Sequence, residues 1–158
     1  MNKYKYGFTL IEMLIVIAII SILSSVFLVG LQGFRASAYD ARRISDLQKV
    51  QSYLEVFYNS DRMYPAAGDW TALTAALKGG SSGVSSVPND PVPGQTYSYC
   101  APTGDSAPQS YILAAQLSSG THSSLKESYH GDLADYTCNP SIMCGDGVNG
   151  EKWLCIKF

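Results

Sequence analysis

Residues 8–31 read FTLIEMLIVIAIISILSSVFLVGL, and this stretch decides how the chain is organised. Its only ionisable side chain is Glu12. A helix of this length spans about 36 Å, which is enough to cross a bilayer core of about 30 Å. The run is longer than the apolar part of an ordinary secretory signal, about 7–15 residues, and no small-residue cleavage motif follows it. The sequence therefore predicts a single transmembrane helix over residues 8–31.

Glu12 lies one turn inside this apolar helix, where a charged side chain is costly. A plain membrane anchor gains nothing from that cost, so the carboxylate predicts a function and a partner. No Lys, Arg or His follows in the same helix before Arg35. We therefore expect the partner of Glu12 to come from another molecule or from a free amine. The alternative is a Glu that is simply tolerated near the membrane interface.

Residues 7–13 read GFTLIEM, and a short leader that contains two lysines precedes them. This pattern resembles the processing signal of the type IV pilin and type II secretion pseudopilin family. The resemblance implies that a membrane-bound prepilin peptidase cuts after Gly7 and methylates the new amino terminus at Phe8. It also implies that Glu12 is an assembly carboxylate, which pairs with the Phe8 amine of a neighbouring subunit. An α-amine has an ordinary pKa of about 7.7–8.0, so at neutral pH it is largely protonated and can neutralise a carboxylate.

The organisation expected from this resemblance has four parts. They are a leader peptide at residues 1–7, a membrane and filament-core half of a long helix at 8–31, an amphipathic half at 32–60 and a globular head at 61–158. The lysines of the leader favour a cytoplasmic leader and a head outside the cytoplasm. We expect a single-pass protein of the cytoplasmic (inner) membrane that later joins a cell-surface or periplasmic filament.

The second half of the long helix is recognised by its period. Apolar side chains recur at steps of three or four residues, at Ile44, Leu47, Val50, Leu54 and Phe57. The charged side chains are expected mostly on the opposite face: Arg42, Arg43, Asp46, Lys49 and Glu55. The pattern predicts one helix from about residue 8 to about residue 60, whose C-terminal half lays an apolar stripe on the head.

The head has an α+β composition. A short helix is predicted over residues 70–77, with Asp69 as its N-cap. Alternating, aromatic-rich segments predict three strands, at residues 97–100, 111–117 and 153–158. Residues 118–150 are mostly turn-formers and are expected to form a loop. We predict a small antiparallel meander of three strands packed on the long helix, the arrangement of a pilin fold.

The four cysteines all lie in the part of the chain expected outside the cytoplasm, where disulfides persist. They are Cys100, Cys138, Cys144 and Cys155. A zinc site is the alternative, but no Cys-x-x-Cys pair is present. Two disulfides allow three connectivities. Cys100 and Cys155 would lie on the outer strands of a meander in chain order, so Cys100–Cys138 with Cys144–Cys155 is the favoured pairing.

Two blocks of the head, FYNSDRMYP at residues 57–65 and VPNDPVPGQTYSY at residues 87–99, resemble the major type II pseudopilin. In that subgroup the loop before the last strand binds calcium. The corresponding acidic residues here are Asp132, Asp135 and Asp146. Calcium takes six to eight oxygen ligands, and these carboxylates lack the spacing of an EF-hand. A solvated acidic loop is therefore the alternative to a calcium site, and no other cofactor is expected.

Composition argues against an enzyme and against a nucleic-acid-binding protein. The net charge is −2 and the pI is near 5.6, which leaves no excess of basic residues for binding phosphates. No Gly-x-Ser-x-Gly nucleophile motif is present, and His122 and His130 fall in a polar segment without an evident partner. We expect a structural subunit of an extracytoplasmic helical filament, either a type IV pilus or a type II secretion pseudopilus. Its expected partners are copies of itself, the prepilin peptidase, an inner-membrane assembly platform and, before assembly, membrane lipid. The alternative is a membrane-anchored extracytoplasmic binding or adhesion module.

Overall fold

The structure, a computed structural model, describes residues 7–80, 83–139, 141–145 and 152–158, apart from the side chains of residues 26–32. Most of the predicted leader therefore lies outside the described residues. The internal contacts divide the chain into two units, one ending at Ser37 and the other beginning at Ala38. The second unit combines the C-terminal part of the long helix with everything that follows it.

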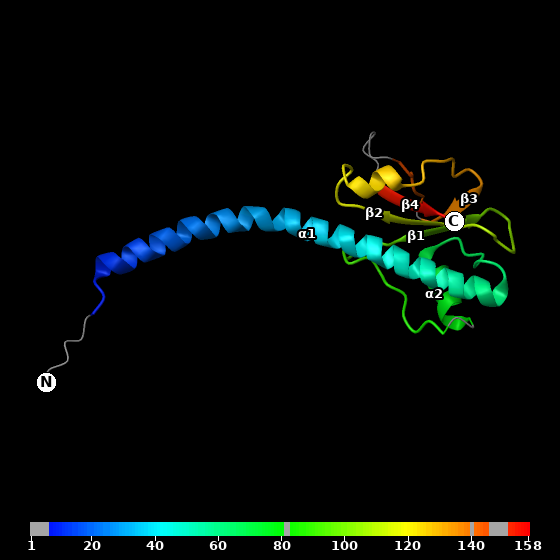
Figure 1. Ribbon diagram of the computed structural model, residues 1–158, viewed down its shortest axis with the longest axis horizontal. Helices are drawn as coiled ribbons and strands as arrows, with labels where there is room; N and C mark the ends of the chain where they lie inside the picture. The colour runs from blue at the N-terminus through cyan, green and yellow to red at the C-terminus, as the bar shows by residue number, and fades with distance from the viewer. Residues whose placement is uncertain (1–6, 81–82, 140, 146–151) are drawn as a thin grey trace. The chain divides into compact units, whose positions relative to one another are not determined.

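Both predicted helices are present (Figure 1). The long helix is α1, which spans Leu10–Asp61, and the short helix is α2, which spans Trp70–Gly79. The Asp69 side chain accepts a hydrogen bond from the backbone N–H of Ala72 at 2.7 Å. That bond satisfies one of the amide groups that the start of a helix leaves unpaired, so the predicted N-cap is confirmed.

The head contains a four-stranded antiparallel sheet in the order β3-β1-β2-β4. Its strands are β1 at Ser98–Pro102, β2 at Ile112–Gln116, β3 at Tyr136–Cys138 and β4 at Trp153–Lys157. The three predicted strands are β1, β2 and β4, and they form a meander in chain order. Leu113 at the centre of β2 lies opposite Tyr99 on one side and Ile156 on the other. The predicted α+β class is confirmed.

The expectation of a three-stranded sheet with one long loop at residues 118–150, before the last strand, is wrong in one respect. The segment expected to be loop contains β3 and a short 3-10 helix, η1, at Ser123–Glu127. β3 pairs with the outer side of β1, with Cys138 opposite Cys100. A strand of three residues among turn-formers is too short to show the alternating pattern of a strand in the sequence. β3 therefore forms because it pairs with β1, and local strand propensity does not predict it.

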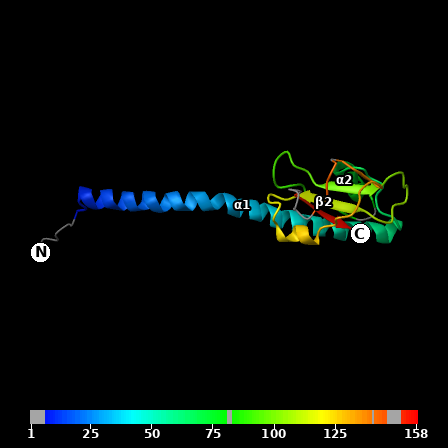
Figure 2. The same cartoon turned by 90° about the horizontal axis from the view of Figure 1, so that it is seen from above.

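The two faces of the sheet are covered by different parts of the chain. Successive residues of a strand point to opposite faces, and Leu113 packs in a cluster with Leu54 of α1 and Leu73 of α2. Its neighbour Ile112 packs on the other face with Ile142 and the cysteines. In both views the C-terminal part of α1 runs alongside the sheet (Figures 1 and 2). The head therefore has a helical layer, a central sheet and an outer layer of disulfide-linked loop.

The predicted apolar stripe of α1 faces this core. Leu47, Val50 and Leu54 are completely buried. The placement of Arg43 on the solvent face is wrong, because its exposed fraction is 1% and that of nearby Asp40 is 2%. Both charges are buried because polar groups of the head converge on them.

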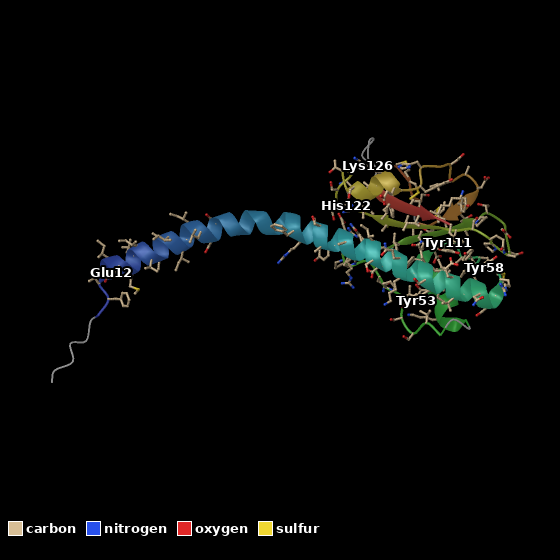
Figure 3. The ribbon with its side chains drawn as sticks, viewed as in Figure 1. Glu12, Tyr53, Tyr58, Tyr111, His122 and Lys126 are labelled. Carbon is tan, nitrogen blue, oxygen red and sulfur yellow. A yellow bond between two sulfur atoms is a disulfide. The ribbon has the colours of Figure 1, made fainter. Side chains whose placement is uncertain are left out.

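Aromatic side chains fill the space beside the C-terminal end of α1. The ring of Tyr64 lies 4.8 Å from that of Tyr58 and 4.6 Å from that of Tyr111, measured between ring centroids. Figure 3 labels Tyr58 and Tyr111 in this region. Tyr111 also stacks on Phe158, with ring centroids 5.7 Å apart, so Phe158 belongs to the same aromatic cluster. Burial raises the pKa of the Tyr64 and Tyr111 hydroxyls above the ordinary value.

Candidate processing and assembly site

The predicted processing site lies in an exposed segment just before α1. Gly7, Phe8 and Thr9 precede the helix and adopt no regular secondary structure. Phe8 is 78% exposed, and a Cβ added at Gly7 would meet no atom within 4 Å. The peptide bond between Gly7 and Phe8 is therefore open to solvent and outside the helix. Figure 3 shows Glu12 at the N-terminal end of α1.

Thr9 and Glu12 form a capping box at the start of α1. The backbone N–H and the hydroxyl of Thr9 both donate to Oε2 of Glu12, at 2.8 and 2.7 Å. In return the backbone N–H of Glu12 donates to Oγ1 of Thr9 at 3.3 Å. This reciprocal pattern satisfies two amide groups that would otherwise lack partners. It explains why the helix begins at Leu10 and leaves the Gly7–Phe8 bond outside.

The expectation that a partner of Glu12 must come from outside the chain is therefore incomplete. Thr9 is a hydrogen-bonding partner within the same turn, although it carries no charge. Both of its bonds go to Oε2, and within the described part of the chain Oε1 accepts no hydrogen bond. A carboxylate has about four lone-pair sites, so Glu12 retains acceptor capacity on its other oxygen. The sequence signal for this cap was Thr-x-x-Glu at residues 9–12.

The large apolar side chains that follow Glu12 on α1 are exposed, with exposed fractions that range from 45% at Val16 to 67% at Ile22. Two hydroxyls in this stretch are satisfied inside the helix. Ser21 donates to the carbonyl of Ile17 at 2.6 Å, and Ser25 donates to the carbonyl of Ile22 at 2.7 Å. Their presence therefore does not require a polar partner.

No helix combines the length and the apolar character needed to cross a membrane in the part of the chain that the structure describes. The predicted span at residues 8–31 continues into residues 26–32, whose side chains are outside the described set. It stays a prediction.

A second set of polar groups that the sequence did not reveal surrounds Arg43 in the head. The guanidinium makes two bonds to the Asp90 carboxylate, at 2.7 Å from Nε and 3.0 Å from Nη2. It also donates to Asp40 at 2.9 Å, to Gln95 at 2.5 Å and to Ser118 at 3.3 Å. Burial by itself would lower the pKa of Arg43, but the hydrogen bonds and charges of the two carboxylates outweigh burial and raise it.

The carboxylate of Asp40 also accepts hydrogen bonds from the segment that follows β2. It accepts the backbone N–H of Ser118 at 2.9 Å and the Ser118 hydroxyl at 3.0 Å. Asp90 in turn accepts the backbone N–H of Val92 at 2.8 Å. The available signal was the Pro-Asn-Asp-Pro segment, whose aspartate is Asp90. A pattern of apolar and polar residues cannot tell a buried charge from an exposed one.

The cysteines pair as Cys100–Cys138 and Cys144–Cys155, the pairing favoured from the sequence. Cys100 and Cys138 lie directly opposite each other on β1 and β3, with their Cα atoms 4.5 Å apart. This is the spacing of a non-hydrogen-bonded antiparallel pair. β1 is an inner strand and not an outer one, because β3 covers it.

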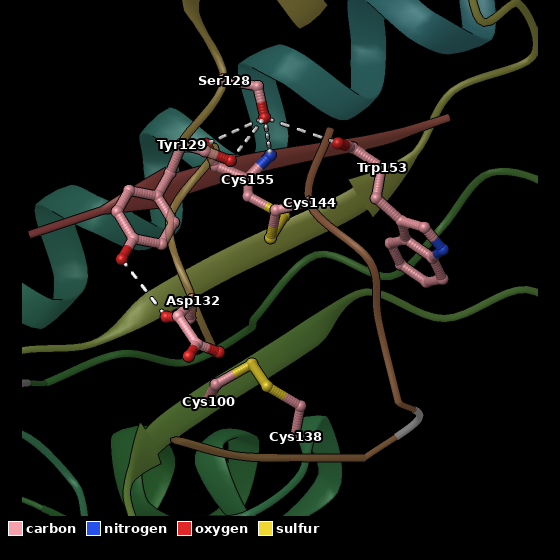
Figure 4. Close-up of a disulfide and its surroundings, with 8 residues drawn as sticks. All are labelled: Cys100, Ser128, Tyr129, Asp132, Cys138, Cys144, Trp153 and Cys155. Carbon is pink, nitrogen blue, oxygen red and sulfur yellow. Dashed lines mark hydrogen bonds between the residues drawn. A yellow bond between two sulfur atoms is a disulfide. The ribbon is translucent and has the colours of Figure 1, made fainter. Parts of the chain in front are cut away.

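The second disulfide joins Cys155 of β4 to Cys144, and Figure 4 shows the backbone of Cys155 beside Ser128 and Tyr129. Cys155 donates its backbone N–H to the Ser128 hydroxyl at 2.9 Å, and its carbonyl accepts the backbone N–H of Tyr129 at 2.8 Å. Cys144 forms an isolated bridge with Trp153 further along the same edge. An open strand edge is a template for unwanted pairing, and these contacts occupy the N-terminal and central parts of the edge.

The predicted calcium ligands are only partly described. Asp132 accepts a hydrogen bond from the backbone N–H of Ala134 at 2.9 Å, while Asp146 lies outside the described residues. Among the residues that are described, no group of three His, Cys, Asp or Glu side chains is placed to hold a metal ion. A calcium site that includes Asp135 and Asp146 stays a prediction.

His122 has a partner that the sequence did not suggest. Its Nδ1 accepts the backbone N–H of Ser124 at 3.3 Å, so it caps η1. His130 is exposed. The absence of an evident partner predicted for His122 is therefore wrong, and its partner is structural.

Comparison with known proteins gives a match to a family model and to a curated relative. The prokaryotic N-terminal methylation motif matches residues 2–28. The chain is also similar to the type II secretion system core protein G of Dickeya chrysanthemi, with 31% identity over 65 residues. That similarity covers 41% of this chain and 42% of the relative, so the chain matches less than half of the relative's length. No solved structure matches the chain. The methylation motif, the likeness to core protein G and the long helix packed with a small antiparallel sheet together support the resemblance of this chain to pilins and pseudopilins.

Proposed function

We propose that this chain is a structural subunit of an extracytoplasmic helical filament. In this proposal a prepilin peptidase cuts between Gly7 and Phe8 and methylates the new Phe8 amine. Residues 8–31 hold the subunit in the cytoplasmic membrane, with the head outside, until an inner-membrane assembly platform transfers it into the filament. Glu12 of one subunit then pairs with the Phe8 amine of a neighbour.

The observation that carries the processing step is the position of the Gly7–Phe8 bond. A peptidase needs an extended, accessible backbone at the bond that it cuts, and this bond is exposed and outside α1. The capping box starts the helix just after it, because Thr9 is the N-cap. Removal of residues 1–7 leaves Thr9 and Glu12 in place, so the cut does not dismantle the helix start.

The assembly step is supported by the free side of the Glu12 carboxylate. Oε2 is engaged by Thr9, whereas Oε1 accepts no hydrogen bond from the described residues. A protonated amine of a neighbour can therefore bind Oε1 while the capping box persists. In an apolar filament core an unpaired carboxylate or amine is costly. The pair thereby selects the stagger at which Glu12 meets Phe8 of the next subunit.

The proposal has two versions that differ in the type of filament. Similarity to core protein G supports a type II secretion pseudopilus, whereas a head linked by two disulfides suits a surface pilus exposed to the medium. Long filaments seen on intact cells by electron microscopy would favour the pilus. A secretion defect without such filaments in a deletion strain would favour the pseudopilus.

Intact-mass spectrometry of the filament-bound subunit tests the processing step. We expect a chain that begins at Phe8 and carries one methyl group, and a Gly7→Val variant that keeps its leader and does not assemble. Polymerised subunits that still begin at Met1 would overturn the proposal. An unpolymerised protein that retains Met1 and displays its head would instead support the alternative, a membrane-anchored binding or adhesion module.

A matched pair of variants separates the two roles of Glu12. Glu12→Gln removes the charge but keeps a side-chain carbonyl that can complete the capping box. Thr9→Val keeps the charge but removes the capping hydroxyl. If charge pairing drives assembly, Glu12→Gln inserts and is cleaved but yields far fewer filaments, whereas Thr9→Val assembles better than Glu12→Gln. Normal filament yield from Glu12→Gln would refute the pairing mechanism.

A further inference from the structure

The apolar stripe of α1 does not by itself define where the head sits along the helix. Its members are spaced three, three, four and three residues apart from Ile44 to Phe57. A slide of three residues, about 4.5 Å along the axis, would bring Leu47, Val50 and Tyr53 to the places of Ile44, Leu47 and Val50. The hydrophobic effect is non-directional and follows buried area. It therefore discriminates weakly between these two seatings.

The polar cluster around Arg43 discriminates strongly. Asp40 and Arg43 come from α1, Asp90 comes from the segment before β1, and Ser118 follows β2. The side chains of Arg43, Asp40 and Asp90 are 2%, 3% and 1% exposed, respectively. In a seating shifted by the same three residues, Asp46 would take the position of Arg43 and would face Asp90 with like charge.

Further down the same helix, three side-chain contacts require the same register. The Tyr97 hydroxyl donates to Asp46 at 2.8 Å. The Tyr64 hydroxyl donates to Glu55 at 3.1 Å, and the Tyr58 hydroxyl donates to Gln109 of the head at 2.8 Å. A slide of α1 would break all three contacts together with the Arg43 cluster.

A buried ion cluster is weak evidence for net stability, because desolvation offsets much of the attraction between the charges. Replacing all members by apolar side chains is often neutral or stabilising, whereas removing one member leaves a buried charge unpaired. What such a cluster supplies best is a choice between packings of similar energy. We infer that Asp40, Arg43 and Asp90 form a registry device, which selects one seating of α1 on the head from several that the apolar stripe permits.

This inference goes beyond the proposed function and does not depend on it, because it concerns the unassembled chain. Its consequence for a filament subunit is direct. Every copy in a helical filament must present its head at the same position along its helix. A chain with two seatings would supply a mixture of subunits.

The test uses the full chain in detergent micelles and the NMR signals of its two tryptophan indoles. Trp70 packs edge-to-face on Tyr97, with ring centroids 5.1 Å apart, and Tyr97 is held by Asp46 of α1. The Trp70 signal therefore reports the seating of α1. Trp153 lies on β4, where it is paired to β2, and it serves as an internal control. In the unmodified chain each indole should give one signal.

The decisive variant combines Asp40→Leu, Arg43→Met and Asp90→Leu. We expect it to keep a thermal midpoint close to that of the unmodified chain, to split or broaden the Trp70 signal and to leave the Trp153 signal single. Arg35→Met is the matched control, since Arg35 is an exposed arginine of the same helix, and it should leave both signals unchanged. A folded triple variant with single, unshifted indole signals would overturn the inference.

Arg43→Lys keeps the inference falsifiable if the triple variant fails to fold. Lysine retains the charge but cannot make the planar, two-point contact with Asp90. We expect a second Trp70 signal from this variant as well. A single native signal from Arg43→Lys would mean that a buried positive charge is enough and that the geometry of the cluster does not select the seating.

Discussion

The two disulfides should contribute unequally to the stability of the head, and the difference can be estimated from the residues that they enclose. Cys100–Cys138 joins cysteines 38 residues apart, whereas Cys144–Cys155 joins cysteines 11 residues apart. The perturbation is to remove each bridge separately, with Cys100→Ala/Cys138→Ala in one variant and Cys144→Ala/Cys155→Ala in the other.

Loop-closure entropy sets the expected magnitudes. A cross-link restricts the unfolded chain more when it closes a longer loop, and the chain-entropy relation gives about 3.9 kcal/mol for a separation of 38. The same relation gives about 2.8 kcal/mol for a separation of 11. The packing losses should be similar, because each bridge has one fully or almost fully buried cysteine, Cys100 at 0% and Cys155 at 1% exposure. The first variant should therefore lose about 1 kcal/mol more than the second.

Urea denaturation of the full chain in detergent, followed by the fluorescence of Trp70 and Trp153, measures both losses. The slope of the free energy against urea must be compared as well, because a cross-link also limits how far the unfolded chain expands. A larger loss from the Cys144/Cys155 variant would refute the entropic reasoning. That result would mean that the second disulfide acts mainly in the folded state, by holding Cys144 against β4.

Three further predictions concern the core, a helix cap and the tyrosines of the head. Leu54→Ala should lower the free energy of unfolding of the head by about 2–5 kcal/mol, because Leu54 is fully buried. Val56→Ala, at a half-exposed site, should change it by less than about 0.5 kcal/mol in urea denaturation. Equal losses would contradict the assigned buried face of α1. Asp69→Ala should cost about 1 kcal/mol in the same assay, because it removes the acceptor for the first turn of α2, and an unchanged midpoint would exclude a capping role. Burial raises the pKa of the Tyr97 and Tyr99 hydroxyls, and for Tyr97 the hydrogen bond to Asp46 adds to this effect. The unfolded chain therefore releases these protons at lower pH than the folded chain, so the contribution of the two tyrosines to folding stability should be complete below a pH of about 10 and should fall as the pH rises above it. Absorbance at 295 nm should report late ionisation in the folded state, and ionisation at the ordinary pKa would contradict the burial.

Much of this architecture follows from short-range patterns. The apolar run after Glu12 and the stripe from Ile44 to Phe57 both repeat with the period of a helix, and they predict α1 to within a few residues at each end. Asp69 marks the start of α2 because a capping side chain acts within its own turn. The Thr-x-x-Glu signal at residues 9–12 was equally local. An interpretation of Glu12 only as a charged residue therefore does not identify this capping signal.

The features that the sequence does not reveal depend on residues far apart along the chain. β3 exists because Tyr136–Cys138 pairs with β1, where Cys100 lies 38 residues before Cys138. Arg43 is buried because Asp90, 47 residues away, and Ser118, 75 residues away, converge on it. Taken alone, each of these side chains looks like an ordinary surface residue.

The amino-acid sequence by itself determined the long helix, the class of the head and the N-terminal methylation motif, because helix periodicity, capping and a contiguous motif are encoded within a few neighbouring residues. Only the tertiary structure decided the fourth strand and the buried Arg43 cluster. The physical reason is that strand pairing and charge burial are stable only when distant groups supply the missing hydrogen bonds. Those partners become neighbours only in the folded chain.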